Sequence, residues 1–211
     1  MIAQPVSPAD KFTRPAFDAY YTPLAVARAC VDAVWHVKSR RVLRVVEPAV
    51  GAGSWTKALR ERQEGVGVVG VDIDPQAPGL DLCDVAIVGD FLERSQSLRA
   101  DLVIGNPPYS GDVCRWVDAS LQVAPMVAFL LRGTILGSQG RARWWRSLPP
   151  SDVFVLTSRP RWEGPGAQPS TDSVDSVLVV WKNDGDLASP TLLHWLDVPK
   201  PGQPPREVTR G

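Results

Sequence analysis

Four short runs rich in valine and isoleucine recur in the first half of the chain, and each leads into an acidic residue or a turn. The runs cover residues 42–46, 66–71, 85–88 and 101–104, and the polar residues that follow them are Glu47, Asp72, Asp90 and Asn106. Runs of this length with many β-branched residues predict buried strands. Ligands of open α/β sheets bind at the carboxyl ends of the strands, so we expect these four side chains to face one site.

The fourth run continues into Asn106-Pro107-Pro108-Tyr109. Proline has no N–H group and cannot continue a sheet ladder, so the chain must leave the strand at Asn106 and stay extended through both prolines. The Asn106 side-chain carbonyl and the Pro107 main-chain carbonyl can then accept hydrogen bonds from one amino group. Tyr109 offers an aromatic face to a flat ring.

The first strand is followed by a turn with glycines at 51 and 53, and then by a predicted helix over residues 54–62. Glycine lets the backbone pass close to a ligand, and the amino end of a helix faces whatever binds there. Thr56 stands at the third glycine position of the dinucleotide-binding fingerprint, so that fingerprint fails. Asp72, at the tip of the second strand, is placed to accept both hydroxyls of a ribose, and Asp74 is expected to cap the following turn.

The segment from Asn106 to Tyr109 resembles the NPPY signature of S-adenosylmethionine-dependent amino-methyltransferases, most of which act on adenine N6 in DNA. The resemblance implies a Rossmann-like, seven-stranded class I methyltransferase sheet. That sheet is mostly parallel, with helices on both faces and an antiparallel hairpin at its carboxyl end, here residues 152–157 and 176–181. It further implies direct, in-line transfer of the sulfonium methyl to a flipped adenine. Asn106, Pro107, Pro108 and Tyr109 would form the catalytic turn, with Tyr109 stacked on the base.

The same resemblance implies S-adenosylmethionine as cofactor and supplies a set of residues for it. Glu47 would meet the ammonium group of the methionine part, and Asp90 and Phe91 would bind the adenine. Thr22 is expected as the N-cap of a helix whose first residue is Pro23. The full cofactor set is Tyr21, Thr22, Pro23, Glu47, Ala49, Gly51, Gly53, Asp72, Ile73, Asp90, Phe91 and Asn106.

Two later segments carry arginines interleaved with tryptophans, a pattern that suits phosphate and base contacts. A predicted helix over residues 137–147 holds Trp144 and Trp145, of which one is expected in the core. The loop 158–172 holds Trp162, which stands where some phage-type adenine methyltransferases have the second aromatic against the flipped base. The nucleic-acid set is Tyr109, Trp162, Arg141, Arg143, Arg146, Arg159 and Arg161.

The composition of the chain bears on several other classes of protein and of site. Lys plus Arg and Asp plus Glu both total 23, so nucleic-acid binding needs a local patch of positive charge. The cysteines at 30, 83 and 114 form neither a disulfide framework nor a metal site, and none lies in the catalytic turn, which argues against cytosine carbon-5 chemistry. No apolar segment is long enough for a membrane span or an export signal, so we expect a cytoplasmic protein. We also expect a monomer or a homodimer, and no metal ion in the site.

We expect an amino-terminal arm over residues 1–16, a catalytic domain over 17–198 and a disordered tail over 199–211. The cofactor segment precedes the catalytic turn, as in the gamma arrangement of these enzymes, and no separate target-recognition domain follows. A solitary phage or prophage enzyme fits this organisation, with specificity supplied by the loops at 110–115, 137–147 and 158–175. The motif also leaves open RNA adenine, cytosine N4 and protein glutamine as substrates, and a non-catalytic subunit that binds cofactor or DNA.

Overall fold

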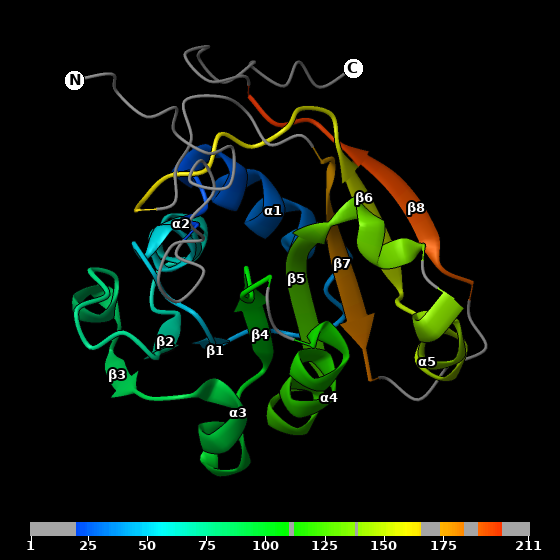
Figure 1. Ribbon diagram of the computed structural model, residues 1–211. Coiled ribbons are helices and arrows are strands. Elements are labelled where there is room, and N and C mark those ends of the chain that lie inside the picture. The colour runs from blue at the N-terminus through cyan, green and yellow to red at the C-terminus, as the bar shows by residue number, and fades with distance from the viewer. Residues whose placement is uncertain (1–19, 110–111, 138, 166–173, 184–189, 200–211) are drawn as a thin grey trace, which may run out of the picture.

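A computed structural model describes residues 20–109, 112–137, 139–165, 174–183 and 190–199. In these segments the chain forms an eight-stranded sheet with helices on both faces (Figure 1). The strands are β1 (Arg44–Glu47), β2 (Gly67–Asp72), β3 (Val85–Val88), β4 (Leu102–Gly105), β5 (Met126–Arg132), β6 (Asp152–Leu156), β7 (Ser176–Lys182) and β8 (Leu192–Leu196). The α-helices are α1 (Leu24–Val37), α2 (Ser54–Arg62), α3 (Phe91–Arg94), α4 (Val113–Val123) and α5 (Ala142–Ser147). Short 3₁₀ turns are η3 (Leu80–Leu82), η4 (Ser95–Ser97), η5 (Gly133–Leu136) and η6 (Gln139–Arg141).

The strand order is β3-β2-β1-β4-β5-β7-β6-β8. The first five strands in this order run parallel, β7 is antiparallel to both β5 and β6, and β8 is parallel to β6. The order changes direction between β1 and β4, which is where an open parallel sheet forms a crevice at its carboxyl edge. The fold class expected from the sequence is confirmed, including the antiparallel pairing of β6 and β7.

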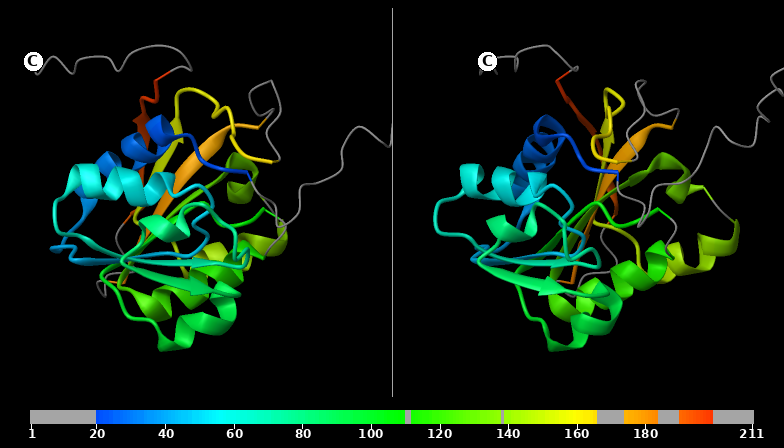
Figure 2. Two further views of the ribbon diagram at one scale, coloured as in Figure 1. Left: turned by 90° about the vertical axis from the view of Figure 1, so that its left-hand side faces the viewer. Right: turned by 60° about the vertical axis from the view of Figure 1, so that its left-hand side comes forward.

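The two faces of the sheet bury two separate apolar layers. Along β5, Met126, Ala128 and Leu130 belong to the layer that contains residues of α1 and α2, whereas Val127, Phe129 and Leu131 belong to the layer of α3 and α4. This division follows from the two-residue period of a strand, and a strand covered on both faces is apolar throughout. Figure 2 shows the blue and cyan helices on one side of the sheet and the green helices on the other.

The eighth strand was not predicted. β8 is an edge strand in which Leu192, Leu193 and Trp195 stay 54%, 56% and 69% exposed. Its sequence is apolar at four of five positions and lacks the apolar–polar alternation that predicts a half-buried strand. What holds it is pairing with β6 over five residues, together with a hydrogen bond between the His194 ring and Asp152 Oδ1 at 3.0 Å.

The start of α1 corrects one expectation. Thr22 is not the N-cap: Pro23 is the cap residue, with no side-chain cap bond, and the helix begins at Leu24. The Pro23 carbonyl accepts from the N–H groups of Val26 and Ala27. The Thr22 hydroxyl is buried and accepts a hydrogen bond from the Trp55 indole N–H at 3.2 Å, so it joins α1 to α2.

The helix predicted over residues 137–147 is shorter than expected, since its α-helical part is α5 and the turns η5 and η6 precede it. Both of its tryptophans pack, where one was expected to do so. Trp144 and Trp145 lie against Trp181 of β7, with ring centroids 6.1 and 5.9 Å away, and each indole N–H donates a hydrogen bond. Both indoles are partly buried, and each has a ring contact and a paired N–H group.

The predicted arm at 1–16 lies outside the described residues, as does the predicted tail at 199–211 except for Pro199. No helix within the described ranges has both the length and the apolar character needed to cross a bilayer.

Candidate active site

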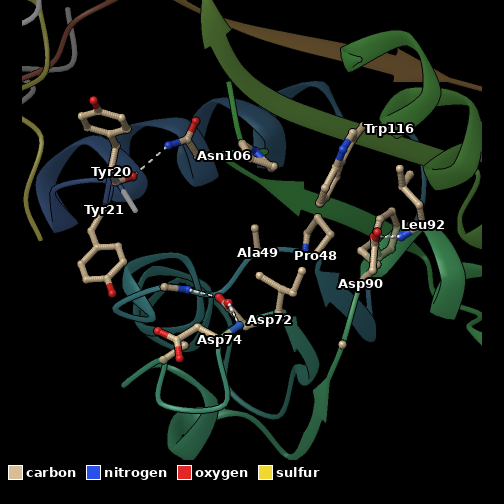
Figure 3. Close-up of a pocket in the computed structure, with 16 residues that line it drawn as sticks. Tyr20, Tyr21, Pro48, Ala49, Asp72, Asp74, Asp90, Leu92, Asn106 and Trp116 are labelled. Carbon is tan, nitrogen blue, oxygen red and sulfur yellow. Dashed lines mark hydrogen bonds between the residues drawn. The ribbon is translucent and has the colours of Figure 1, made fainter. Parts of the chain in front are cut away.

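A cavity of about 290 Å³ opens at the carboxyl ends of β1 to β4, where the sequence placed the polar strand ends (Figure 3). Residues at or just after the end of each of these strands line it, among them Ala49, Asp72, Asp90 and Asn106. Its size is near the lower end of the range of about 300 to 1,000 Å³ that is usual for small-molecule sites. We call it the first cavity.

Asp72 is held in place by backbone donors. Its Oδ2 accepts the Gly51 N–H at 2.8 Å and its Oδ1 accepts the Asp74 N–H at 2.9 Å. Each carboxylate oxygen can accept more than one hydrogen bond, so a fixed carboxylate with remaining acceptor capacity faces the cavity. Asp74 also lines the cavity and caps the next turn through a bond from the Gln76 N–H, as predicted. Ile73 lies beside them and is 51% exposed.

At the other end of the first cavity, Asp90 is the N-cap of α3 and accepts the Leu92 N–H at 2.8 Å. The Phe91 ring is buried and stacks on Trp116 of α4, with centroids 5.2 Å apart and planes 23° apart. Trp116 lines the cavity as well. Trp116 was not among the predicted site residues, because helical periodicity does not show which end of a sheet a residue approaches.

The glycine turn between β1 and α2 brings the backbone against Tyr21. Gly51 has φ +51° and Gly53 has φ +74°, values that favour glycine. A Cβ atom on Gly51 would lie 2.7 Å from Tyr21 Cδ1, and one on Gly164 would lie 2.5 Å from Tyr21 Cδ2. The Tyr21 ring is therefore clamped between two glycines at the edge of the cavity. Of the predicted segment Tyr21–Pro23, only Tyr21 lines the first cavity, and Thr22 borders a smaller pocket beside it.

Glu47 does not line the first cavity. Its side chain is fully buried, and its Oε2 accepts hydrogen bonds from the N–H and the hydroxyl of Thr56 in the first turn of α2. Within the described residues its Oε1 has no hydrogen-bond partner. Burial raises the pKa of this carboxyl to about 8, against the smaller effect of the Thr56 bonds. Glu47 thus anchors the amino end of the helix that follows the glycine turn.

Asn106 has a defined orientation. Its Nδ2 donates to the main-chain carbonyl of Tyr20 at 3.3 Å, while its Oδ1 is buried and accepts no hydrogen bond from the described residues. A buried acceptor without a donor is costly, and most such groups in proteins are paired. The amide is therefore set as an acceptor at the wall of the first cavity.

A second cavity of about 250 Å³ lies on the other side of the same turn, lined by Pro107, Pro108 and Tyr109 together with Arg132 and Arg141. Pro108 borders both cavities, so the turn separates them. Arg132 lies over the Tyr109 ring, with its Cζ atom 4.5 Å from the centroid. Arg132 was not among the predicted residues, because a lone arginine at the end of a strand carries no motif.

Trp162 is buried and lines neither cavity. It contacts the Tyr109 ring edge-on, with centroids 5.8 Å apart and planes 71° apart. Its loop is joined to the first cavity, because Tyr21 and Glu163 exchange two backbone hydrogen bonds of 2.8 and 2.9 Å. A loop far away in sequence thus supports both the cavity wall and the aromatic ring of the turn.

The remaining predicted arginines are spread over the surface. Arg143 and Arg146 are exposed on α5, Arg161 is exposed beside Trp162, and Arg159 pairs with Asp175 at 2.8 Å. Arg141 alone among them lines a cavity, with its Nη2 donating to the Thr134 carbonyl at 3.2 Å. The three cysteines are free, and the described residues contain no cluster of histidine, cysteine and carboxylate side chains that could hold a metal ion.

The fold of this chain resembles that of known structures over most of the chain's length. A protein from Listeria monocytogenes described as a class I S-adenosylmethionine-dependent methyltransferase superposes with a TM-score of 0.63 at 14% identity, over 93% of this chain and 70% of that one. The fold is that of the class I methyltransferases. S-adenosylmethionine is the cofactor expected of this methyltransferase fold.

The similarity in sequence covers a shorter part of the chain than the similarity in structure. No protein-family model matches the chain. A Type II methyltransferase of Thermus thermophilus is 43% identical over 67 residues, which is 31% of this chain and 16% of the relative. A Type II methyltransferase of a Paramecium bursaria Chlorella virus is 34% identical over 68 residues, 31% of this chain and 18% of the relative. The matched segment thus spans less than a fifth of the length of either relative.

Proposed function

We propose that the chain is an S-adenosylmethionine-dependent amino-methyltransferase that methylates adenine N6 in DNA. The observation that carries this proposal is the state of Asn106: its Oδ1 is a buried acceptor that receives no hydrogen bond from the described residues, and Tyr20 holds the amide in that orientation. Such a group suits a substrate that brings its own N–H donors. The exocyclic amino group of a base is a donor of this kind.

The residues of the first cavity fit the cofactor. The stacked Phe91 and Trp116, with Asp90 beside them, offer an apolar slot and an acceptor for an adenine ring and its amino group. Asp72 offers a fixed carboxylate for ribose hydroxyls, and Gly51 and Tyr21, which pack against each other, line the wall beside which the methionine part would lie. When bound, the cofactor would supply a methyl group on a positively charged sulfur, which is the electrophile.

Catalysis would rest on positioning. The amino nitrogen of adenine is a poor nucleophile because its lone pair is delocalised into the ring. If Asn106 Oδ1 and the Pro107 carbonyl accept its two hydrogens, they favour the pyramidal nitrogen and aim its lone pair into the first cavity. Transfer would then be direct: the nitrogen–carbon bond forms as the carbon–sulfur bond breaks, the neutral thioether leaves, and the nitrogen releases its extra proton to solvent, with no covalent bond between the protein and the base.

DNA is the substrate suggested by the Type II methyltransferases that match the chain, and adenine is suggested by the resemblance of Asn106–Tyr109 to the NPPY turn. The second cavity lies where a base extruded from a helix would reach that turn, with Tyr109 for stacking and Arg141 near its rim. Trp162 would support Tyr109 from its edge. The exposed arginines of α5 and of the 158–165 loop would contact phosphates.

The test is methyl transfer from labelled S-adenosylmethionine to unmethylated DNA by the wild-type protein and by Asn106→Ala. Transfer should fall by about 10²-fold or more, the size of effect found when a preorganised polar contact to the reacting group is removed. Cofactor affinity should change little, because Asn106 is only one part of that cavity wall. Asn183→Ala, an exposed asparagine at the opposite edge of the sheet, is the matched control. Equal activity of Asn106→Ala and wild type would rule out the proposed mechanism.

A further inference from the structure

The Tyr109 ring is covered on the side where a base would stack. The ring packs against the core layer that contains Trp162. The guanidinium of Arg132 lies over the ring with its Cζ 4.5 Å from the centroid, and both side chains line the second cavity. The face of Tyr109 that opens toward this cavity therefore already carries a flat, charged group.

A guanidinium is planar and stacks on aromatic faces, much as a base does. Its position over the ring is the position that a stacked base must take. Arg132 is the last residue of β5, and its backbone is fixed by the pairing with Ser176 on β7, so a movement of the guanidinium would involve the side chain alone. The group can thus leave the ring without any change in the sheet.

We infer that Arg132 is a placeholder for the target base: its guanidinium covers Tyr109 in the free protein, and a flipped base displaces it toward a neighbouring DNA phosphate. This inference rests on the proposed function. A base stacked on an aromatic side chain gains more than a cation–π contact at a partly exposed site provides, so the exchange favours the base. The displaced cation regains a partner through a charge-assisted bond to phosphate.

Arg141 has a different place in the same cavity. Its guanidinium donates a hydrogen bond to the Thr134 carbonyl at 3.2 Å. Of the two arginines, Arg132 is the one described over the Tyr109 ring, so the two can be distinguished by substitution. Arg132→Met keeps the length of the side chain and removes its charge and donors. Arg41→Met, at the amino end of the sheet, is the matched control.

The first measurement is binding of adenosine, which has no phosphate, to proteins saturated with S-adenosylhomocysteine so that the first cavity is filled. Removing the competing guanidinium should make Arg132→Met bind adenosine roughly 2- to 5-fold more tightly than wild type, the range that corresponds to a cation–π contact at a partly exposed site. Arg41→Met should match wild type. Unchanged, weaker or undetectable binding of adenosine by Arg132→Met would overturn the proposal that the Arg132 guanidinium occupies the position of the base.

The second measurement is binding of single-stranded oligo(dA) as a function of salt concentration. Loss of one phosphate contact should reduce the slope of log affinity against log salt by about 0.7 for Arg132→Met. Arg132→Lys keeps the charge and should retain the wild-type slope, which also covers the case in which the methionine variant folds poorly. An unchanged slope in Arg132→Met would overturn the phosphate contact.

The two proposals fail in different ways. A wild-type protein that neither binds S-adenosylhomocysteine nor transfers a methyl group contradicts the proposed function. A wild-type protein that does both, with an Arg132→Met variant that binds adenosine no more tightly, contradicts the role of Arg132 alone.

Discussion

Two buried acceptors define the site at the scale of single residues. Asn106 Oδ1 and Glu47 Oε1 are both shielded from solvent without a partner among the described residues, yet they differ in what surrounds them. Asn106 borders the first cavity, whereas Glu47 lies behind the glycine turn against Thr56. The first can meet a substrate, and the second can hold a proton.

The Glu47 carboxyl makes stability depend on pH. Its pKa is about 8 in the folded protein, above the ordinary value of 4.5, because burial disfavours the charged form. Stability from this group is therefore fully present below pH 4.5 and is lost as pH rises through 8, with a limiting slope of about 1.4 kcal/mol per pH unit. Glu47→Gln should flatten the decline of the melting temperature between pH 5 and 9. Glu64→Gln, an exposed control, should leave it as steep as in wild type, and equal slopes for both variants would contradict the assignment.

Substitutions of Gly51 and Gly65 distinguish the effect of close packing from the effect of backbone strain. Both have positive φ, +51° and +73°, but a Cβ on Gly51 would strike Tyr21 at 2.7 Å, whereas one on Gly65 meets nothing within 4 Å. Gly51→Ala should push Tyr21 and weaken S-adenosylmethionine binding by at least about tenfold, a loss of roughly 1.4 kcal/mol. Gly65→Ala should cost about 1 kcal/mol of stability and leave affinity unchanged. Calorimetric titration with S-adenosylmethionine measures the affinity of both variants. Equal affinities would contradict a role for Tyr21 in cofactor binding.

At the scale of elements, one buried carboxylate joins three strands. Asp152 of β6 accepts hydrogen bonds from Lys182 of β7 at 2.9 Å and from His194 of β8 at 3.0 Å. Burial alone would raise the pKa of this carboxyl, but the bonds from Lys182, His194 and Ser151 outweigh it, and the pKa is lowered. The charged carboxylate therefore stabilises the fold above its ordinary pKa of 3.8, and this contribution is lost as pH falls below that value.

Asp152→Asn should lower the free energy of unfolding by about 3 kcal/mol, because the Lys182 ammonium, only 16% exposed, loses its counter-charge. Hydrogen exchange should rise first in β8, which depends on this contact and has little buried surface. Asp175→Asn, which breaks the exposed pair with Arg159, should cost less than about 1 kcal/mol. Equal losses in the free energy of unfolding for the two variants would contradict the proposal that the buried three-strand contact stabilises the fold more than an exposed ion pair does.

The elements also show which parts of the fold could be predicted. Strands β1 to β4 could be found because each joins a β-branched run to a polar strand end, so periodicity and turn chemistry agree. β8 was missed because four of its five residues are apolar, so its sequence lacks the apolar–polar alternation of a half-buried strand. Thr22 was misassigned because its partner, Trp55, lies 33 residues away and sequence spacing cannot reveal it.

At the scale of the whole molecule, the catalytic turn separates two cavities that open on either side of Pro108. The polar strand ends that sequence placed near one another do gather at one edge of the sheet, apart from Glu47, which turns into the core. The second cavity was not predicted, since Arg132 and Thr134 reach it only through the course of β5 and η5. This chain covers less than a fifth of the relatives it matches, so the site must be tested on the chain itself.

The most direct test is nucleoside analysis of the product after incubation with labelled S-adenosylmethionine and equal amounts of unmethylated DNA, RNA and a protein extract. The account predicts label in DNA as N6-methyladenine, absent when Asn106→Ala replaces the wild-type protein. Label in N4-methylcytosine, RNA or protein would contradict the assigned substrate while leaving the fold and the cofactor cavity intact. No label in any of them, despite cofactor binding, would contradict the catalytic role of the turn.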